Sequence, residues 1–194
     1  MGFLAQAAAS ARWDYDPWRA MLERQVGLAR DVSALEQLPV LLGALGTAVA
    51  WSGDFAAATA LNAEADAVCE ATGSRAAPFT AMMLASFRGN QTEAAPLIEG
   101  TIAAATAVAY AQWMAAISYN GLSRYHEALA AARQASEDTS TIYISMWAMP
   151  ELIEAAAAEG KRTSRPEFCS DCRNSPRQAS PTGDWAWRRA AARC

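Results

Sequence analysis

Apolar residues recur at three- and four-residue spacing through most of the first 160 positions. The pattern begins with Trp18, Met21, Leu22 and Val26. Residues spaced in this way lie on one face of a helix and give that face an apolar surface to bury. No segment between turn signals shows the sustained two-residue alternation of a half-buried strand. The pattern therefore predicts an all-α fold.

Capping and turn residues set the expected helix boundaries. Asp16-Pro17 predicts a helix start, because Asp accepts hydrogen bonds from free backbone N–H groups and Pro fits the first turn. Ser33 opens a sequence with capping-box spacing, but Pro39 competes with it as the start of the second helix. The last helix contains Pro150, where a kink is possible. The expected helices span 16–30, 39–51, 54–73, 78–87, 90–102, 108–119, 124–137 and 142–159.

Three short phrases repeat, each with the character of a tight turn followed by a first helical turn. They are Gly-Asp-Phe-Ala-Ala-Ala at 53–58, Gly-Asn-Gln-Thr-Glu-Ala at 89–94 and Ser-Arg-Tyr-His-Glu-Ala at 123–128. Their final alanines lie 36 and 34 residues apart. A period near 34 in a helical sequence is typical of stacked tetratricopeptide (TPR) helix pairs. The expectation is a short superhelix of TPR-like antiparallel helix pairs over residues 13–160.

The sequence changes character after Gly160. Residues 161–194 hold 8 of the 16 basic residues, 3 of the 4 cysteines and three prolines, without an amphipathic period. Two explanations stay open, a disordered tail and the product of a shifted reading frame. Residues 1–12 are expected to form a flexible N-terminus. The predicted organisation is thus 1–12, the repeat domain 13–160, and a poorly structured tail 161–194.

Composition limits the possible partners. Of the 194 residues, 48 are Ala, which favours helix but buries little area, so Leu, Met, Trp and Ile must supply the packing. The net charge of −4 gives no basic surface for nucleic acid. No apolar run is long enough to span a membrane. We expect a cytoplasmic protein without direct nucleic-acid or membrane binding.

Few residues suggest chemistry. Cys169 and Cys172 form a lone Cys-x-x-Cys pair, which supplies only two of the four ligands of a structural zinc site. A metal or thiol-redox function through this pair is the third hypothesis for the chain. His126, the only histidine, has no fixed partner for catalysis. No phosphate-binding glycine loop is recognisable. We therefore expect no enzyme activity, catalytic residue, metal site or cofactor.

The aromatic residues allow two interpretations. Large rings can fill the core of an alanine-rich helical protein. Alternatively, rings on a concave surface can stack on a sugar or a peptide. The candidate ligand or partner surface consists of Trp113, Tyr119, Tyr125 and Trp147.

Longer phrases resemble a known family. Tyr-Asn-Gly-Leu-Ser-Arg-Tyr-His-Glu-Ala-Leu at 119–129 and Trp-Ala-Met-Pro-Glu-Leu at 147–152 are similar to the helical repeat region of large LuxR-type transcriptional regulators with an ATP-binding domain. The resemblance covers roughly 13–160. It implies a repeat region that senses an inducer or a partner protein.

In that family an ATPase domain precedes the repeats and a DNA-binding helix-turn-helix follows them. Neither is recognisable here, so the resemblance implies a fragment that does not bind DNA itself. The alternative function is a free-standing TPR-like adaptor that binds a peptide.

Overall fold

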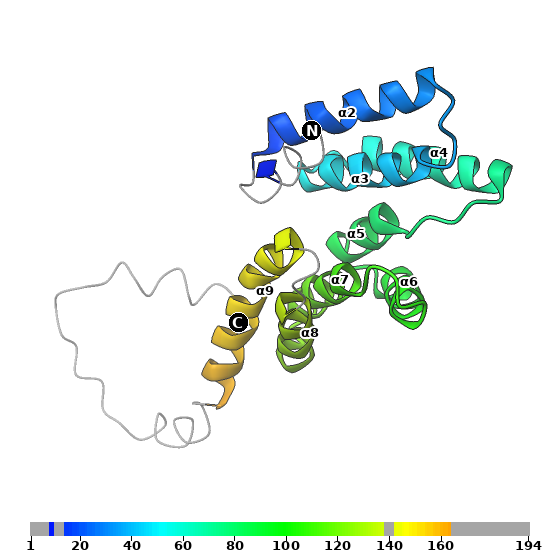
Figure 1. Ribbon diagram of the computed structural model, residues 1–194. Helices are drawn as coiled ribbons and strands as arrows, with labels where there is room; N and C mark the ends of the chain where they lie inside the picture. The colour runs from blue at the N-terminus through cyan, green and yellow to red at the C-terminus, as the bar shows by residue number, and fades with distance from the viewer. Residues whose placement is uncertain (1–7, 10–13, 138–141, 164–194) are drawn as a thin grey trace, which may run out of the picture. The chain divides into compact units, whose positions relative to one another are not determined.

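All regular secondary structure in the described part of the chain is helical. The computed structural model describes residues 8–9, 14–137 and 142–163 (Figure 1). The helices are α2 Tyr15–Asp31, α3 Leu38–Trp51, α4 Phe55–Thr72, α5 Phe79–Phe87, α6 Gln91–Ala103, α7 Val108–Gly121, α8 Tyr125–Glu137 and α9 Ile142–Thr163. The predicted all-α fold class is confirmed.

The chain divides into two units, Met1–Gly160 and Lys161–Cys194. Nearly all of the expected flexible N-terminus and of the tail at 161–194, including Cys169 and Cys172, lies outside the described residues. Within those residues, no helix is long and apolar enough to cross a membrane.

Helix boundaries differ from expectation by only a few residues. Helix α2 begins at Tyr15, flanked by Asp14 rather than Asp16, and no side-chain cap is formed. Helix α3 carries Pro39 in its first turn, as one alternative proposed. Ser33 has a left-handed backbone, with φ of 53°, and so terminates the turn after α2 instead of capping α3. Helix α9 runs through Pro150 and ends at Thr163.

The three repeated phrases share one backbone conformation. Gly53, Gly89 and Ser123 have φ values of 89°, 66° and 58° and lie in three-residue connections between helices. Asp54 and Asn90 follow the glycines, and each side chain accepts a hydrogen bond from the backbone N–H three residues later, at 3.0 and 3.4 Å. All three phrases therefore encode a left-handed turn, and the first two follow it with an N-terminal cap.

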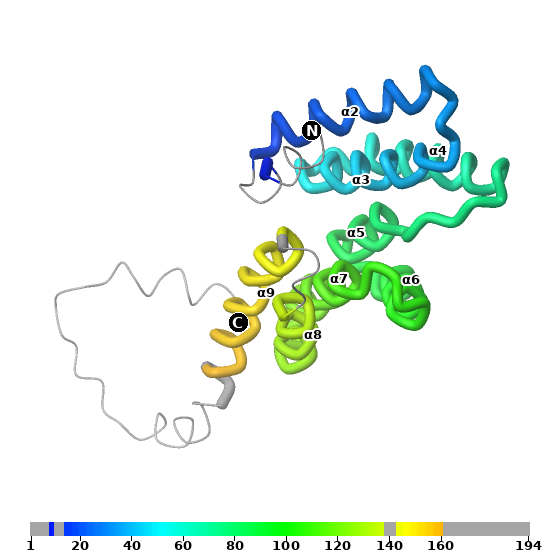
Figure 2. The backbone as a smooth tube through the Cα atoms, viewed as in Figure 1, coloured from blue at the N-terminus to red at the C-terminus, as the bar shows by residue number. Residues whose placement is uncertain are grey.

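Consecutive helices pack against each other. Contacts join α2 to α3, α3 to α4, α5 to α6, α6 to α7, and α7 to α8 (Figure 2). Helix α5 also packs on α3 and α7, which links the first three helices to the later ones. Alanines occupy many buried positions, among them Ala48, Ala58, Ala111 and Ala132, each fully buried. Their small side chains allow neighbouring helix backbones to approach closely.

Helices α3 and α5 approach each other closely at Gly46. A Cβ atom built on Gly46 would lie 2.8 Å from Cγ2 and 3.2 Å from Cβ of Thr80. Thr80 is 1% exposed, and its hydroxyl donates a 2.9 Å hydrogen bond to the carbonyl oxygen of Gly43. This packing leaves no room for a side chain at position 46.

Buried polar groups reinforce this joint. The Thr47 hydroxyl also donates to the Gly43 carbonyl, at 2.9 Å. From α7, the Tyr110 hydroxyl donates to the carbonyl oxygen of Phe79 at 3.0 Å. Burial raises the pKa of Tyr110, so the phenol remains protonated and available as a donor. Helices α3, α5 and α7 are thus connected by side-chain hydrogen bonds as well as by apolar contact.

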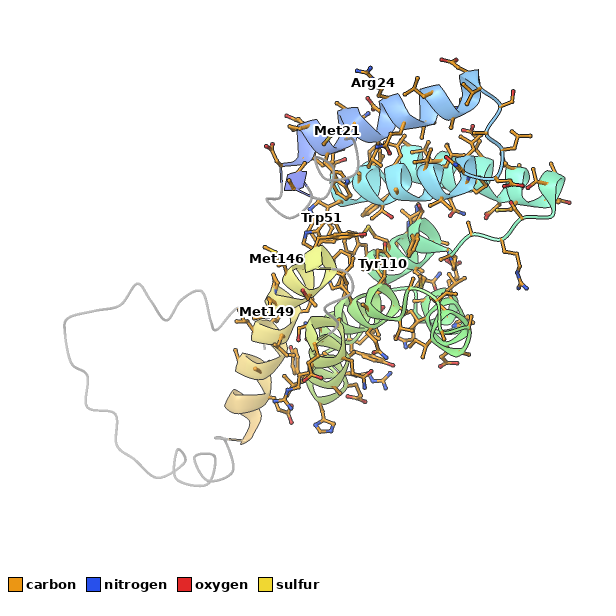
Figure 3. The ribbon with its side chains drawn as sticks, in the orientation of Figure 1. Met21, Arg24, Trp51, Tyr110, Met146 and Met149 are labelled. Atoms are coloured by element: carbon orange, nitrogen blue, oxygen red, sulfur yellow. The ribbon has the colours of Figure 1, made fainter. Side chains whose placement is uncertain are left out.

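Tryptophans fill the space where four helices meet. The Trp147 ring of α9 lies 5.4 Å from that of Trp18, 6.0 Å from Trp51 and 5.2 Å from Trp113, measured between ring centroids. Trp51 projects from the end of α3 toward this region (Figure 3). These four residues form the tryptophan cluster, which joins α2, α3, α7 and α9.

Exchanging serine and glycine at the left-handed position of the shared turn should change the free energy of unfolding in opposite directions. Ser123→Gly should raise the free energy of unfolding by about 0.5 to 1 kcal/mol, because glycine adopts positive φ without a steric penalty. Gly89→Ser should lower it by a similar amount, since a Cβ there meets nothing within 4 Å and only the backbone resists. Urea denaturation measures both changes. Equal effects of the same sign would contradict a common turn.

Gly46→Ala should destabilise the protein by about 1 to 3 kcal/mol, because the added methyl overlaps buried Thr80. Gly27→Ala in α2 is the matched control, since its Cβ would meet nothing within 4 Å. That change should stabilise by about 0.5 to 1 kcal/mol. Adding Thr80→Ala to Gly46→Ala should recover part of the loss in a double-mutant cycle. Strictly additive effects would show that the two residues do not clash.

Candidate ligand-binding site

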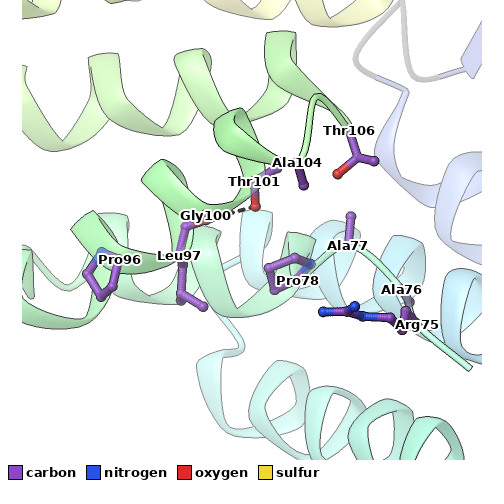
Figure 4. Close-up of a pocket in the computed structure, with 10 residues that line it drawn as sticks. All are labelled: Arg75, Ala76, Ala77, Pro78, Pro96, Leu97, Gly100, Thr101, Ala104 and Thr106. Atoms are coloured by element: carbon purple, nitrogen blue, oxygen red, sulfur yellow. Dashed lines mark hydrogen bonds between the residues drawn. The ribbon is translucent and has the colours of Figure 1, made fainter. Parts of the chain in front are cut away.

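A hollow of about 540 Å³ lies between the α4–α5 linker, helix α6 and the α6–α7 loop (Figure 4). Its volume is within the range of small-molecule sites, about 300–1,000 Å³. Residues from these three segments are far enough apart in sequence that only the fold brings them together. The lining residues are Arg75, Ala76, Ala77, Pro78, Pro96, Leu97, Gly100, Thr101, Ala104 and Thr106.

The linker between α4 and α5 forms one wall of the hollow, and residues at its two ends determine its conformation. Gly73 ends α4 with a left-handed φ of 67°. The Thr72 hydroxyl then donates to the Ser74 hydroxyl at 2.7 Å, which holds the start of the linker. Pro78 immediately precedes α5 and flanks its first turn. The segment 74–77 is therefore non-helical and presents Arg75 to the hollow.

The loop of residues 104–107 forms the second wall and has an unusual backbone. Ala105 and Ala107 have positive φ values of 53° and 49°. An alanine in this conformation costs about 1 kcal/mol relative to a right-handed one. The Ala105 N–H donates to the carbonyl of Ile102 at 2.9 Å, which closes the turn. The loop therefore has a strained backbone on both sides of Thr106.

The hollow is apolar apart from one charge and two hydroxyl groups. Arg75 is exposed, and Figure 4 shows its side chain extending alongside Pro78. The Thr101 hydroxyl donates its hydrogen to the carbonyl oxygen of Leu97 at 2.8 Å, so this hydrogen is not available to a ligand. Thr106 is exposed in the loop. No acidic residue is among the lining residues, so the charge of Arg75 is uncompensated within the hollow.

The predicted aromatic surface is divided between core and exterior. Trp113 is 0% exposed and Trp147 is 5% exposed, so both rings pack in the tryptophan cluster. A ligand could contact them only by displacing their neighbours. Tyr119 and Tyr125 are half-buried, and the Arg124 guanidinium carbon lies 4.5 Å from the ring centroid of Tyr119. None of the four lines the hollow, and a partner surface at the two tyrosines stays a prediction.

A polar contact fastens α9 to α7. The Asn120 side-chain amide donates to the backbone oxygen of Glu151 at 3.1 Å and to its Oε2 at 2.8 Å. Burial raises the pKa of Glu151 and nearby Glu154 adds to this, while the hydrogen bond from Asn120 opposes it. The carboxylate is thus partly desolvated at the contact between α7 and α9.

The other residues considered for chemistry are an exposed histidine and a half-buried cysteine. His126 is exposed on the first turn of α8. Cys69 is half-buried on α4 with a free thiol. In the ranges that the structure describes, no three His, Cys, Asp or Glu side chains gather as metal ligands. The hypothesis based on Cys169 and Cys172 concerns residues outside these ranges.

Comparison of the chain with protein-family models, with curated proteins and with solved structures finds no match. Function is therefore inferred from the residues of this chain. Sequence patterns alone do not reveal the hollow, because Arg75 and Thr106 belong to no motif. Their only signal is a position in connections between helices, where binding residues are common.

The raised pKa of Glu151 predicts a pH-dependent stability. Because the folded-state pKa exceeds the ordinary value of 4.5, the favourable contribution of this group is present below that value and is lost as pH rises through the raised pKa. Glu151→Gln should raise the melting temperature at pH 7, where the wild-type carboxyl is ionised, and should change it little well below pH 4.5, where that carboxyl is protonated. Glu154→Gln, at an exposed position, is the control and should have a smaller effect. A melting temperature that falls at pH 7 in Glu151→Gln would contradict the desolvation argument.

Proposed function

We propose that this chain is a ligand-sensing helical-repeat module, which works by binding and not by catalysis or direct DNA contact. The observation that carries the proposal is the hollow beside Arg75. It lies where the linker after α4 meets α6 and the loop before α7. A small molecule seated there contacts the connection between two sets of helices, and its binding energy favours one arrangement of them.

The resemblance to LuxR-type regulators gives this module a context. In that context the chain corresponds to the TPR-like sensor region, and occupancy of the hollow would be passed to an ATPase and a DNA-binding domain of the parent regulator. Support comes from the recurring left-handed turns at residues 53, 89 and 123 and from the sequential helix pairing. The DNA flanking the coding region, read in all frames, tests this context. Sequences for both domains would support it, and their absence would favour an independent module.

An adaptor function is the second candidate, favoured by a separate observation. Met146, Met149 and Ile153 follow helical spacing on α9 and are 44%, 44% and 64% exposed. Figure 3 shows Met146 and Met149 extending from α9. An exposed apolar stripe of this kind is suited to a partner helix. The adaptor would use this surface in place of the hollow.

Filling the hollow tests the sensing function. Gly100 lines it, and a Cβ there would meet nothing within 4 Å, so Gly100→Phe should occupy the space without a clash. A metabolite library is screened by thermal shift with the full chain. Compounds that raise the melting temperature of the wild type should have no effect on Gly100→Phe.

Gly27→Phe is the matched control, because position 27 is equally open but lies on α2 and does not line the hollow. It should respond to ligands as the wild type does. Stabilising compounds that act equally on Gly100→Phe would place ligand binding elsewhere and reject the hollow as the sensing site. A library without any stabilising compound would also count against a small-molecule sensor.

A further inference from the structure

Arg19, Arg30 and Arg124 each form a salt bridge with a glutamate. Among the described arginines, Arg24, Arg75 and Arg133 form neither a salt bridge nor a side-chain hydrogen bond, and of these three Arg75 lines the hollow. The planar guanidinium of Arg75 therefore keeps its full set of N–H donors available for a ligand.

The walls around this cation are apolar. Pro78 and Leu97 flank the space into which the Arg75 side chain extends, and Pro96 and Gly100 continue the surface along α6 (Figure 4). A ligand that fits must present an anionic group to Arg75 and an apolar body to the prolines and the leucine. Neither a cation nor a fully polar molecule is complementary to this arrangement.

The number of donors limits the charge of the ligand. Phosphate groups are usually held by several cations or by a row of backbone N–H groups, because a dianion loses more hydration than one exposed arginine replaces. A carboxylate carries one charge and pairs with a single guanidinium in a two-pronged geometry. The single arginine of the hollow thus matches a monoanion.

We propose that the hollow binds a small organic carboxylate with an apolar aliphatic or aromatic body, and that Arg75 is its specificity-determining residue. The carboxylate forms paired hydrogen bonds with the Arg75 guanidinium, and the body packs on Pro78, Pro96 and Leu97. Thr106, at the loop, provides a hydroxyl at the rim. This inference rests on the proposed sensing function and names the chemical class of the effector.

The test uses pairs of probes with the same apolar body and similar shape, in which a carboxylate is replaced by an uncharged primary amide. Benzoate and benzamide, and hexanoate and hexanamide, are titrated into the full ¹⁵N-labelled chain, and amide shifts are followed at residues 75–77 and 97–106. The carboxylates should shift these amides and bind at least about tenfold more tightly than their uncharged partners, because a charge-assisted pair with Arg75 is lost in the amides.

Substitutions assign the preference to Arg75. Arg75→Ala should weaken both carboxylates at least about tenfold and leave both amides unchanged, so that the discrimination disappears. Arg75→Lys, which keeps the charge but not the planar donor pair, should give an intermediate affinity. Arg24→Ala is the control, since Arg24 is an exposed arginine of α2 outside the hollow. It should bind all four probes as the wild type does.

Three results would overturn the inference. They are equal affinity for the charged and uncharged probes, unchanged carboxylate affinity in Arg75→Ala, and no shift of the named amides with either carboxylate. These outcomes are separable from failure of the sensing function. An uncharged library compound that binds the wild type but not Gly100→Phe would preserve the hollow as a sensing site while rejecting its carboxylate preference.

Discussion

The close approach of α3 and α5 at Gly46 is the constraint on which the arrangement of the helices depends. Helix α3 packs on α2 and α4, and α5 packs on α6 and α7, so the contacts of α5 with α3 and with α4 connect the two groups. The absence of a side chain at Gly46 allows Thr80 to reach the carbonyl of Gly43. The buried hydroxyls of Thr47 and Thr80 both find a partner in the Gly43 carbonyl, which offsets the penalty of burying them as the two backbones come together.

The tryptophan cluster supplies the buried apolar area that an alanine-rich core lacks. Alanine contributes little apolar area, and tight alanine packing along helix pairs leaves wider spaces where several helices meet. Trp147 fills such a space and contacts rings from α2, α3 and α7. Large rings therefore provide the area that alanines cannot, and they do so at the joint between non-consecutive helices.

The sequence predicted those features that depend on neighbours along the chain. Helix positions followed from apolar spacing, and the turns at Gly53 and Gly89 from glycine followed by a capping residue. The role of Ser33 could not be predicted in this way, because serine is common at helix caps. Only its backbone conformation shows that it closes the preceding turn. The hollow could not be predicted, because Arg75, Leu97 and Thr106 meet only when α4, α5, α6 and α7 are packed. The burial of Trp113 and Trp147 resolved an ambiguity that ring size alone leaves open.

The contact between Trp18 and Trp147 joins residues 129 positions apart, whereas the repeated turns join neighbouring helices through three residues. Local pairings form early in folding because little chain entropy is lost in closing them. We therefore expect the helix pairs to form first and the contact between Trp18 and Trp147 to form last. The chain would then assemble in stages, in which hairpins form first, the contact between α3 and α5 joins the two groups of helices, and the meeting of α2 with α9 completes the cooperative unit.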